Sequence, residues 1–337
     1  MAIVVVSTGR AIPPRRVTNE DLAALIDTSD EWIRSHTGIG ARHIAADDVA
    51  SSDLGYEAAL NALQYALDQG LVAEKSLKSL IETIDLIVLG SSTQDYYSHP
   101  STACIVQNKL GAVNAAAFDI TEACSSFIFA FETARALLGA GNRRRALVIG
   151  AEVLSKITNW DERETCVLFG DGAGAVLLEQ KEGGGGIIRS VLGSDGSGWE
   201  HLILRRGGSR NPWKKGEVVE QVPAIEMNGH AVYNFAVKVI IKTIKTMLDE
   251  EGIELHDLDL IIPHQANGRI IQAAGKRLNI PEEKFYTNME EYANTSSASI
   301  PIALDECNRS GRIKRGDLVM TVGFGGGLSY GGNLIRW

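Results

Sequence analysis

Cysteine is scarce in this chain of 337 residues, which has four cysteines without paired short spacing. This scarcity argues against a disulfide framework or a structural zinc site, and it is typical of a protein from a reducing compartment. Long apolar runs are also missing, since no stretch approaches the roughly 20 residues that a membrane-spanning helix needs. We therefore expect a protein without a membrane span.

An excess of positive charge is absent too, because 33 Lys and Arg stand against 42 Asp and Glu, giving a net charge of −9. This balance argues against general nucleic-acid binding. The opening Met1–Val6 has no basic residue, and its apolar run is too short for a signal peptide. We interpret it as a first strand and expect a cytoplasmic protein.

What the chain does contain is a faint internal repeat. Three strand-like segments of the first half have counterparts in the same order in the second half: 4–9 with 188–193, 85–90 with 259–264, and 146–150 with 318–323. Each half also ends in a Gly-rich turn followed by a strand. Three matches in one order indicate two copies of one α/β module. The polar, Gly-rich turn 181–186 predicts the boundary, with one half at 1–182 and the other at 183–337.

Amphipathic helical patterns lie between these strands, at 53–69, 229–250 and 267–278. Strands that alternate with helices predict parallel sheets with helices packed against them. The irregular segment 205–222, which holds two Gly-rich or Pro-containing turns, predicts a surface loop.

The most informative stretch surrounds Cys124. A short strand-like piece begins at Phe118, and an apolar helix-forming run covers 125–138, with Gly139 and Gly141 as possible stops. A helix that is apolar on nearly every face must be buried. Cys124 would then stand where a strand turns into a central helix, and the helix N-terminus favours a nucleophilic thiolate.

The alternative is that Cys124 is an inert buried thiol, which is the common role of a free cysteine. The other three cysteines have less favourable settings. Cys104 and Cys307 fall within helical patterns, and Cys166 opens an apolar segment that we predict to be a strand.

Two partners for a thiolate come from the second half. His264 closes the apolar run 260–263, so it stands at the carboxyl end of a predicted strand, where open α/β sheets bind their ligands. Asn294 lies in a turn of small residues before another helical pattern. Taken singly, His264 could be a hydrogen-bonded core histidine and Asn294 a helix cap. Their matching places in the repeat favour a shared site with Cys124.

These residues carry a family resemblance. Cys124, the stretch His264-Gln265-Ala266-Asn267, the stretch Asn294-Thr295-Ser296 and the run Phe324-Gly325-Gly326-Gly327 resemble β-ketoacyl-acyl-carrier-protein synthase III of the thiolase superfamily. The likeness runs nearly end to end, with further matches at 28–33 and 169–174. It implies an α/β fold of the duplicated, thiolase-like, five-layered α-β-α-β-α type, in agreement with the repeat.

The resemblance also implies a reaction. Cys124 would take an acyl group from acyl-CoA and condense it with malonyl-ACP, the malonyl form of the acyl carrier protein, with loss of CO₂. The N–H groups of Cys124 and Gly326 would bind the oxyanion of acylation, and His264 and Asn294 would stabilise the enolate that decarboxylation leaves. This chemistry implies no metal or redox cofactor.

Binding residues follow from the same resemblance, together with a homodimer. Trp32 would stack on the adenine of CoA, Arg163 would cover the other face, and Asn267 belongs to the same CoA-binding set. The acidic carrier protein would dock on Arg269, Lys276 and Arg277. The alternative for Trp32 and Arg163 is a surface Trp beside a solvated Arg without a binding role. The alternative for the three basic residues is a solvated helix face.

Four positions depart from the family pattern. His36 and His230 replace residues common beside CoA, Glu122 introduces a carboxylate two residues before the nucleophile, and His99 follows a long loop, 94–98, where an acyl-pocket residue is expected. With Phe324, His99 would shape the acyl pocket. A carboxylate close to Cys124 would raise its pKa. These departures leave open an unusual starter or acceptor in specialised metabolism.

Three other readings compete. Gly170–Ala175 satisfies a dinucleotide-binding pattern, but a β-rich segment follows it where a helix should open, which argues against a nicotinamide oxidoreductase. A non-catalytic binding protein on the same fold is possible, because fold does not fix function. Within the superfamily, a hydroxymethylglutaryl-CoA synthase would need a general acid such as Glu122, and a polyketide-type acyltransferase would differ in its product.

Overall fold

The first half of the chain forms a five-stranded sheet. A computed structural model describes residues 1–218 and 223–337. The strand order is β1-β7-β6-β4-β5, and β4 lies parallel to both neighbours while β7 runs antiparallel to β1 and β6. The strands are β1 (Ala2–Ala11), β4 (Leu86–Gly90), β5 (Ala116–Ile120), β6 (Arg145–Glu152) and β7 (Gly172–Lys181).

The second sheet repeats this arrangement, in the order β11-β12-β13-β8. Its strands are β8 (Gly186–Ser194), β11 (Leu260–Pro263), β12 (Leu318–Gly325) and β13 (Ser329–Arg336). The parallel pair β11–β12 corresponds to β4–β6, and the antiparallel pair β13–β8 corresponds to β7–β1. A single parallel bridge between Ile261 and Phe285 stands where β5 lies in the first sheet. The predicted repeat is therefore present in the topology.

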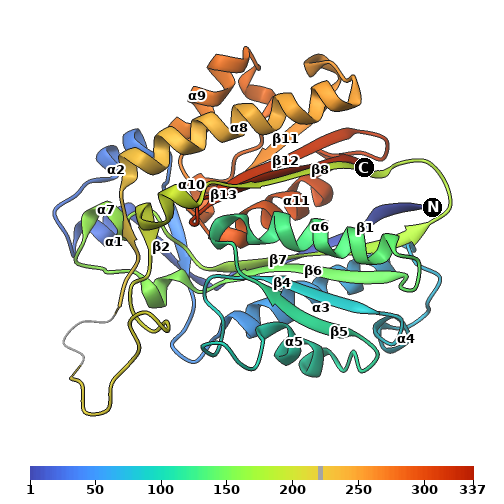
Figure 1. Ribbon diagram of the computed structural model, residues 1–337, viewed down its shortest axis with the longest axis horizontal. Helices are drawn as coiled ribbons and strands as arrows, with labels where there is room; N and C mark the ends of the chain where they lie inside the picture. Colours follow the sequence, from blue (N-terminus) through green and yellow to red (C-terminus); the bar gives the residue numbers. More distant parts are fainter. Residues whose placement is uncertain (219–222) are drawn as a thin grey trace.

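Helices cover both faces of each sheet, which gives five layers (Figure 1). One outer layer holds α3 (Ser51–Asp68) and α5 (Thr102–Leu110), and the other holds α8 (Gly229–Glu251) and α9 (Gly268–Leu278). Between the sheets lie α6 (Ser126–Gly139) and α11 (Ser299–Arg309), one from each half of the chain. This architecture confirms the predicted thiolase-like fold.

The central layer contributes large apolar side chains to the core between the sheets. Phe127 and Phe131 of α6 are 1% and 0% exposed. They share one core cluster with residues of both sheets, among them Val88 and Val148 of the first and Ile262 and Val319 of the second. The predicted central helix after Cys124 is confirmed, but its burial is incomplete, because Phe129 and Glu132 are half-buried and Ala136 is exposed on the side that the two sheets do not cover.

Short elements complete the chain. They are β2 (Arg15–Thr18), α1 (Asn19–Ala23), α2 (Asp30–Thr37), β3 (Ala41–Ile44), α4 (Leu77–Ile81), α7 (Arg163–Cys166), β9 (Leu202–Ile203), β10 (Glu226–Met227) and α10 (Met289–Tyr292). Among the 3₁₀ turns, η1 (Ala123–Ser125) and η6 (Ser296–Ala298) flank the site described below. The others are η2 (Leu154–Ile157), η3 (Gly196–His201), η4 (Leu255–Asp257) and η5 (Glu282–Lys284).

Two sequence-based expectations need comment. Cys166 ends the short helix α7 instead of opening a strand, because the strand β7 begins only at Gly172. The predicted loop 205–222 joins β9 to β10; its residues 219–222 lie outside the described residues. In the two described ranges, no helix is both long and apolar enough to cross a bilayer.

Candidate active site

Cys124 lies on η1, the tight turn between β5 and α6. The preceding Ala123 has φ +47, in the left-handed region that costs a non-glycine residue strain. The turn packs closely on β12, where a Cβ on Gly325 would lie 2.7 Å from the Cys124 backbone nitrogen. Only glycine at this position lets the second half of the chain approach the cysteine so closely.

The ionisation of Cys124 differs from the sequence-based expectation. Burial, with a smaller contribution from the charge of Glu152, raises the pKa of its thiol to about 12, and the polar Ser296 side chain opposes this shift. The helix α6 begins only at Ser126, so the cysteine precedes the first helical turn. Loss of water around the sulfur therefore outweighs the helix terminus, and the resting thiol is protonated.

His264 directly follows β11 and is 1% exposed. Its Nδ1 lies 2.7 Å from the Ser299 hydroxyl, and its ring meets Phe324 edge to face at 5.4 Å between centroids. Burial lowers the pKa of the imidazole to about 3, so the ring is neutral. Within the described residues Nε2 is buried without a hydrogen-bond partner. Such an orphan ring nitrogen in a cavity wall is available to a ligand.

Asn294 is 6% exposed and is fixed by its own backbone. Its N–H donates to the Leu168 carbonyl at 2.9 Å, and its carbonyl accepts from the Gly170 N–H at 3.1 Å. The side-chain Oδ1 accepts from the Ser296 N–H at 2.8 Å. This bond orients the amide and leaves its NH₂ group as the free donor.

One cavity of about 400 Å³ brings the three residues together. Cys124, His264 and Asn294 all line it, as does Phe324, and Trp32, His36, His230 and Asn267 line it as well. A larger depression of about 810 Å³ lies beside α9, and its lining includes none of the three. The smaller cavity is therefore the candidate active site, with its cysteine from one half of the chain and its histidine and asparagine from the other.

Trp32 on α2 forms a stack with two neighbours. The His36 ring lies parallel to its indole at 4.4 Å, and the Arg163 guanidinium lies 4.7 Å from the indole centroid. The predicted pair of Trp32 and Arg163 is thus in contact, and His36 joins it. A base stacked between the indole and the guanidinium would need roughly 7 Å between these two groups. Arg163 lies closer to the indole than that, so it must move to admit a base.

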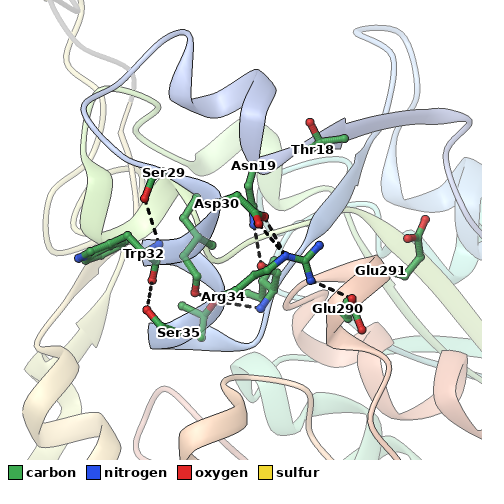
Figure 2. A network of polar contacts seen from close by, with 12 residues as sticks. Thr18, Asn19, Ser29, Asp30, Trp32, Arg34, Ser35, Glu290 and Glu291 are labelled. Carbon is green, nitrogen blue, oxygen red and sulfur yellow. Dashed lines mark hydrogen bonds and ion pairs between the residues drawn. The ribbon is translucent and has the colours of Figure 1, made fainter.

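A polar network holds α2 in place (Figure 2). Asp30 accepts from the buried Asn19 amide at 2.8 Å, and from Arg34, which reaches Glu290 on α10 at 2.8 Å. Ser29 caps the helix by accepting from the Trp32 N–H at 3.1 Å. The Trp32 ring projects away from this network, so the anchored helix presents it at the cavity.

The α9 residues have two different settings. Asn267 caps α9 and donates to the His36 carbonyl at 3.1 Å, and Arg269 donates to the Ser35 carbonyl at 3.0 Å. Both tie α9 to α2. Lys276 and Arg277 are exposed in the last turn of α9. The role of this basic set in docking stays a prediction.

Three further predicted residues lie outside the cavity lining or at its edge. His99 is exposed and does not line the cavity of the single chain, so its acyl-pocket role stays a prediction that depends on a second subunit. Gly326 follows Gly325, which does line the cavity, and its N–H as an oxyanion donor stays a prediction. The backbone N–H of Glu122 donates to the Ser126 hydroxyl, and its carbonyl accepts from the Ser125 hydroxyl.

Sequence reasoning missed Glu152, Ser296 and Ser299. The charge that raises the pKa of Cys124 belongs to Glu152, at the end of β6, and not to the neighbouring Glu122. A lone acidic residue closing a buried strand was a usable signal, because buried carboxylates need specific partners. Ser296 and Ser299 are buried, but serines in a small-residue turn give no comparable signal.

The dinucleotide-binding reading does not hold. Gly172 begins β7, so the Gly-rich run enters a strand where a phosphate-binding motif would open a helix.

Comparison with known proteins agrees with the geometry. The family model for 3-oxoacyl-[acyl-carrier-protein] synthase III matches residues 118–196, and the model for its C-terminal part matches residues 248–337. The chain is 47% identical to β-ketoacyl-[acyl-carrier-protein] synthase III of Caldanaerobacter subterraneus, covering 100% of this chain and 98% of that protein.

Solved structures give the same answer. The 3-oxoacyl-[acyl-carrier-protein] synthase III of Aquifex aeolicus is similar with a TM-score of 0.86 at 38% identity, covering 99% and 100% of the two chains. The priming β-ketosynthase of a polyketide biosynthetic pathway is similar with a TM-score of 0.87 at 32% identity, covering 99% and 96%. The chain belongs to the β-ketoacyl-acyl-carrier-protein synthase III family.

Proposed function

We propose that this chain is a condensing enzyme of fatty acid initiation, which loads an acyl group from acyl-CoA onto Cys124 and condenses it with malonyl-ACP to give β-ketoacyl-ACP and CO₂. The observation that carries this proposal is the cavity shared by Cys124, His264 and Asn294. Family membership supports the reaction class, and the geometry supports the roles of the residues.

The second half-reaction suits the two nitrogen donors. Decarboxylation of the malonyl group places negative charge on the thioester oxygen as an enolate forms. A neutral imidazole with a free Nε2 and an amide with a free NH₂ group match an oxygen that gains charge in a water-poor cavity. The Ser299 hydroxyl at Nδ1 can donate to that nitrogen, which leaves the ring proton on Nε2.

The substrates enter from the α2 and α9 side in this proposal. Trp32, Arg163 and Asn267 would hold CoA, and Arg269, Lys276 and Arg277 would meet the acidic carrier protein. Two sources of support are the Trp32–Arg163 contact and the exposure of the last turn of α9. We further propose a cytoplasmic homodimer that needs no metal or redox cofactor.

A second candidate within the family is a priming synthase of specialised metabolism, which would use another starter or acceptor. The similarity to a polyketide priming ketosynthase favours keeping this candidate, as does His99 beside the long loop 94–98.

Mass spectrometry of the Cys124 peptide after incubation with a panel of acyl-CoA thioesters tests the proposal. We expect a thioester adduct on Cys124, and release of the adduct as β-ketoacyl-ACP when malonyl-ACP is added. The preferred starter in the panel separates the two candidates. A folded protein that forms no adduct with any member would instead support a non-catalytic binding protein.

A further inference from the structure

Asn294 belongs to the second half of the chain, yet the turn that follows it rests on the first sheet. This turn, η6, begins two residues after Asn294 and lies against the carboxyl ends of β4 and β6. A Cβ on Gly150 of β6 would lie 2.4 Å from the Ser297 carbonyl oxygen, so only glycine there admits the turn. The Ser297 hydroxyl lies 2.9 Å from the carbonyl oxygen of Gly90, which pairs with Gly150 across the two strands. The turn is thus seated directly on the backbone of the first sheet.

Glu152, the last residue of β6, holds this turn through Ser297. Its Oε1 accepts from the Ser297 hydroxyl at 2.8 Å and from the Ser297 N–H at 3.4 Å. On the other side, its Oε2 accepts from the Thr93 hydroxyl at 2.6 Å, and the Ser92 N–H lies 3.1 Å from both oxygens. One carboxyl group therefore joins the loop after β4 in the first half to η6 in the second half.

The Glu152 carboxyl is not held by a cation. Its side chain is 0% exposed, and no ion pair among the described residues includes it. Burial raises the pKa of this carboxyl, which means that the folded protein disfavours its charge. An apolar residue would avoid that cost but could not accept hydrogen bonds from several segments at once. The benefit of Glu152 therefore lies in the geometry that it fixes.

The orientation of the Asn294 amide depends on the same turn. Ser296, the first residue of η6, donates its N–H to the Asn294 Oδ1 at 2.8 Å. The φ of Ser296 is +49, in the left-handed region, and such strain persists only where the surrounding structure holds the backbone in place. A shift of η6 would move the Ser296 N–H and turn the amide with it.

We propose that Glu152 is a positioning residue for the condensation step: through Ser297 it fixes η6 and so holds the Asn294 amide in the orientation that binds the enolate oxygen. This inference rests on the proposed function, which assigns the enolate role to Asn294. Glu152 is absent from the described lining of the cavity, so it acts through other residues. A misplacement of about 1 Å in a reacting group can cost about 10²-fold in rate.

Glu152→Gln tests the carboxyl with a side chain of the same shape. The Ser92 N–H lies 3.1 Å from both oxygens, so either orientation of the new amide places its NH₂ group against a donor. We expect CO₂ release from malonyl-ACP by the pre-acylated enzyme to fall roughly tenfold to hundredfold. Acylation of Cys124 should be no slower than in the wild type, because loss of the Glu152 charge lowers the pKa of the thiol. General damage to the fold would slow both steps.

Ser297→Ala removes the link to η6 and leaves the carboxyl in place, so it tests the proposal even if Glu152→Gln does not fold. We expect CO₂ release to fall about tenfold and acylation to change by less than about threefold. Thr8→Val is the matched control, since the Thr8 hydroxyl likewise donates to a buried carboxyl, that of Asp305, at 2.9 Å. Neither residue is in the described lining of the cavity, and both rates should stay at the wild-type level.

The Asn294→Ala background shows whether both residues act through the amide. Members of one hydrogen-bond network have non-additive effects, so Glu152→Gln and Ser297→Ala should slow CO₂ release no further once the amide is gone. Additive losses, or undiminished CO₂ release in both single variants, overturn the positioning role and leave the proposed function intact. A wild-type protein that forms no acyl-enzyme and releases no CO₂ from malonyl-ACP overturns the proposed function, and this inference with it.

Discussion

At the scale of single residues, the site favours the protonated form of its nucleophile. Burial and the Glu152 charge both raise the pKa of Cys124, and they outweigh the opposing effect of the Ser296 side chain. A protonated thiol resists alkylation and oxidation, because the thiolate is the reactive species. The cysteine is thus protected in the free enzyme, and its activation depends on groups around it.

His264→Ala should separate the two half-reactions. Removal of one donor to a developing oxyanion typically costs about 10²–10³ in rate, so we expect CO₂ release from malonyl-ACP to fall by that factor. Acylation of Cys124 should change by less than about tenfold in the same variant, because its oxyanion is proposed to use backbone N–H groups. Single-turnover acylation and ¹⁴CO₂ release measure the two steps.

The surface variant His256→Ala is the control for His264, because the His256 side chain is 82% exposed. Equal losses in acylation and decarboxylation for His264→Ala would contradict the assigned role.

Trp32→Ala should weaken acyl-CoA binding. Loss of one stacking platform for a base costs about 1–3 kcal/mol, so we expect the KM for acyl-CoA to rise roughly tenfold with kcat nearly unchanged. Steady-state kinetics with varied acyl-CoA measure this. Trp213→Ala is the matched control, since Trp213 also carries an arginine over its ring, with Arg206 at 4.9 Å, yet does not line the cavity. A fall in kcat alone would argue against a CoA-binding role.

At the scale of elements, α2 depends on buried polar bonds more than on its visible ion pairs. Asn19 is 0% exposed; it donates to Asp30 and accepts from the buried Arg42 guanidinium at 2.8 Å. Arg34 forms ion pairs with Asp30 and Glu290, but its side chain is 44% exposed. Solvent screens such pairs, so their contribution to stability is small.

Asn19→Ala and Arg34→Ala should therefore differ. The first removes one hydrogen-bond acceptor of the buried Arg42 guanidinium, which keeps its bond to the Val167 carbonyl, and also removes the donor to the Ile39 carbonyl. This loss costs about 1–3 kcal/mol, and it should also raise the KM for acyl-CoA. The second should cost about 0.2–1 kcal/mol. Urea unfolding followed by circular dichroism measures both. Comparable free energies of unfolding for the two variants would show that the exposed ion pairs matter more than we infer.

The last turn of α9 offers a test of carrier-protein docking. Reversal of an exposed charge at an interface mainly lowers the association rate, so Arg277→Glu should reduce kcat/KM for malonyl-ACP about five- to tenfold at low salt. Acylation by acyl-CoA should stay unchanged. Lys245→Glu, at an exposed position of α8, is the control with the same charge change. An equal loss in Lys245→Glu would point to net charge instead of a docking surface.

The sequence predicted the elements that depend on local patterns. The helices α3, α8 and α9 begin and end within a few residues of their apolar patterns, and the repeat predicted that strands of the two halves correspond. Ionisation could not be predicted in this way. The pKa of Cys124 depends on Glu152 at the end of β6, 28 residues later in the chain. No local sequence pattern predicts that these two residues lie close together. The prediction of a strand at Cys166 was wrong for a related reason, since an apolar residue is buried equally well in a short helix.

At the scale of the whole molecule, buried thiol and phenol groups predict loss of stability in alkali. Burial raises the pKa of Cys307 and of Tyr292 to about 12 each, and it raises that of Tyr286 as well. A raised pKa in the folded state means that the unfolded chain loses its protons first. The contribution to stability is therefore complete below about pH 9 and declines as the pH rises towards 12.

We expect the Tm to fall between pH 8 and pH 10.5, and the fall to be smaller in Cys307→Ala when each protein is compared with its own Tm at pH 8. Differential scanning calorimetry measures both. An identical fall in the variant would remove Cys307 from the explanation.

The position of α11 has a consequence for how the chain is made. The inner face of β1 and β7 is complete once Lys181 has been synthesised, but α11, which packs on these strands, begins only at Ser299. At a synthesis rate of about 5–20 residues per second, roughly 6–24 s pass before α11 begins to be made, and during this time α11 cannot cover that apolar face. Nascent chains of intermediate length should accordingly be clients of holdase chaperones.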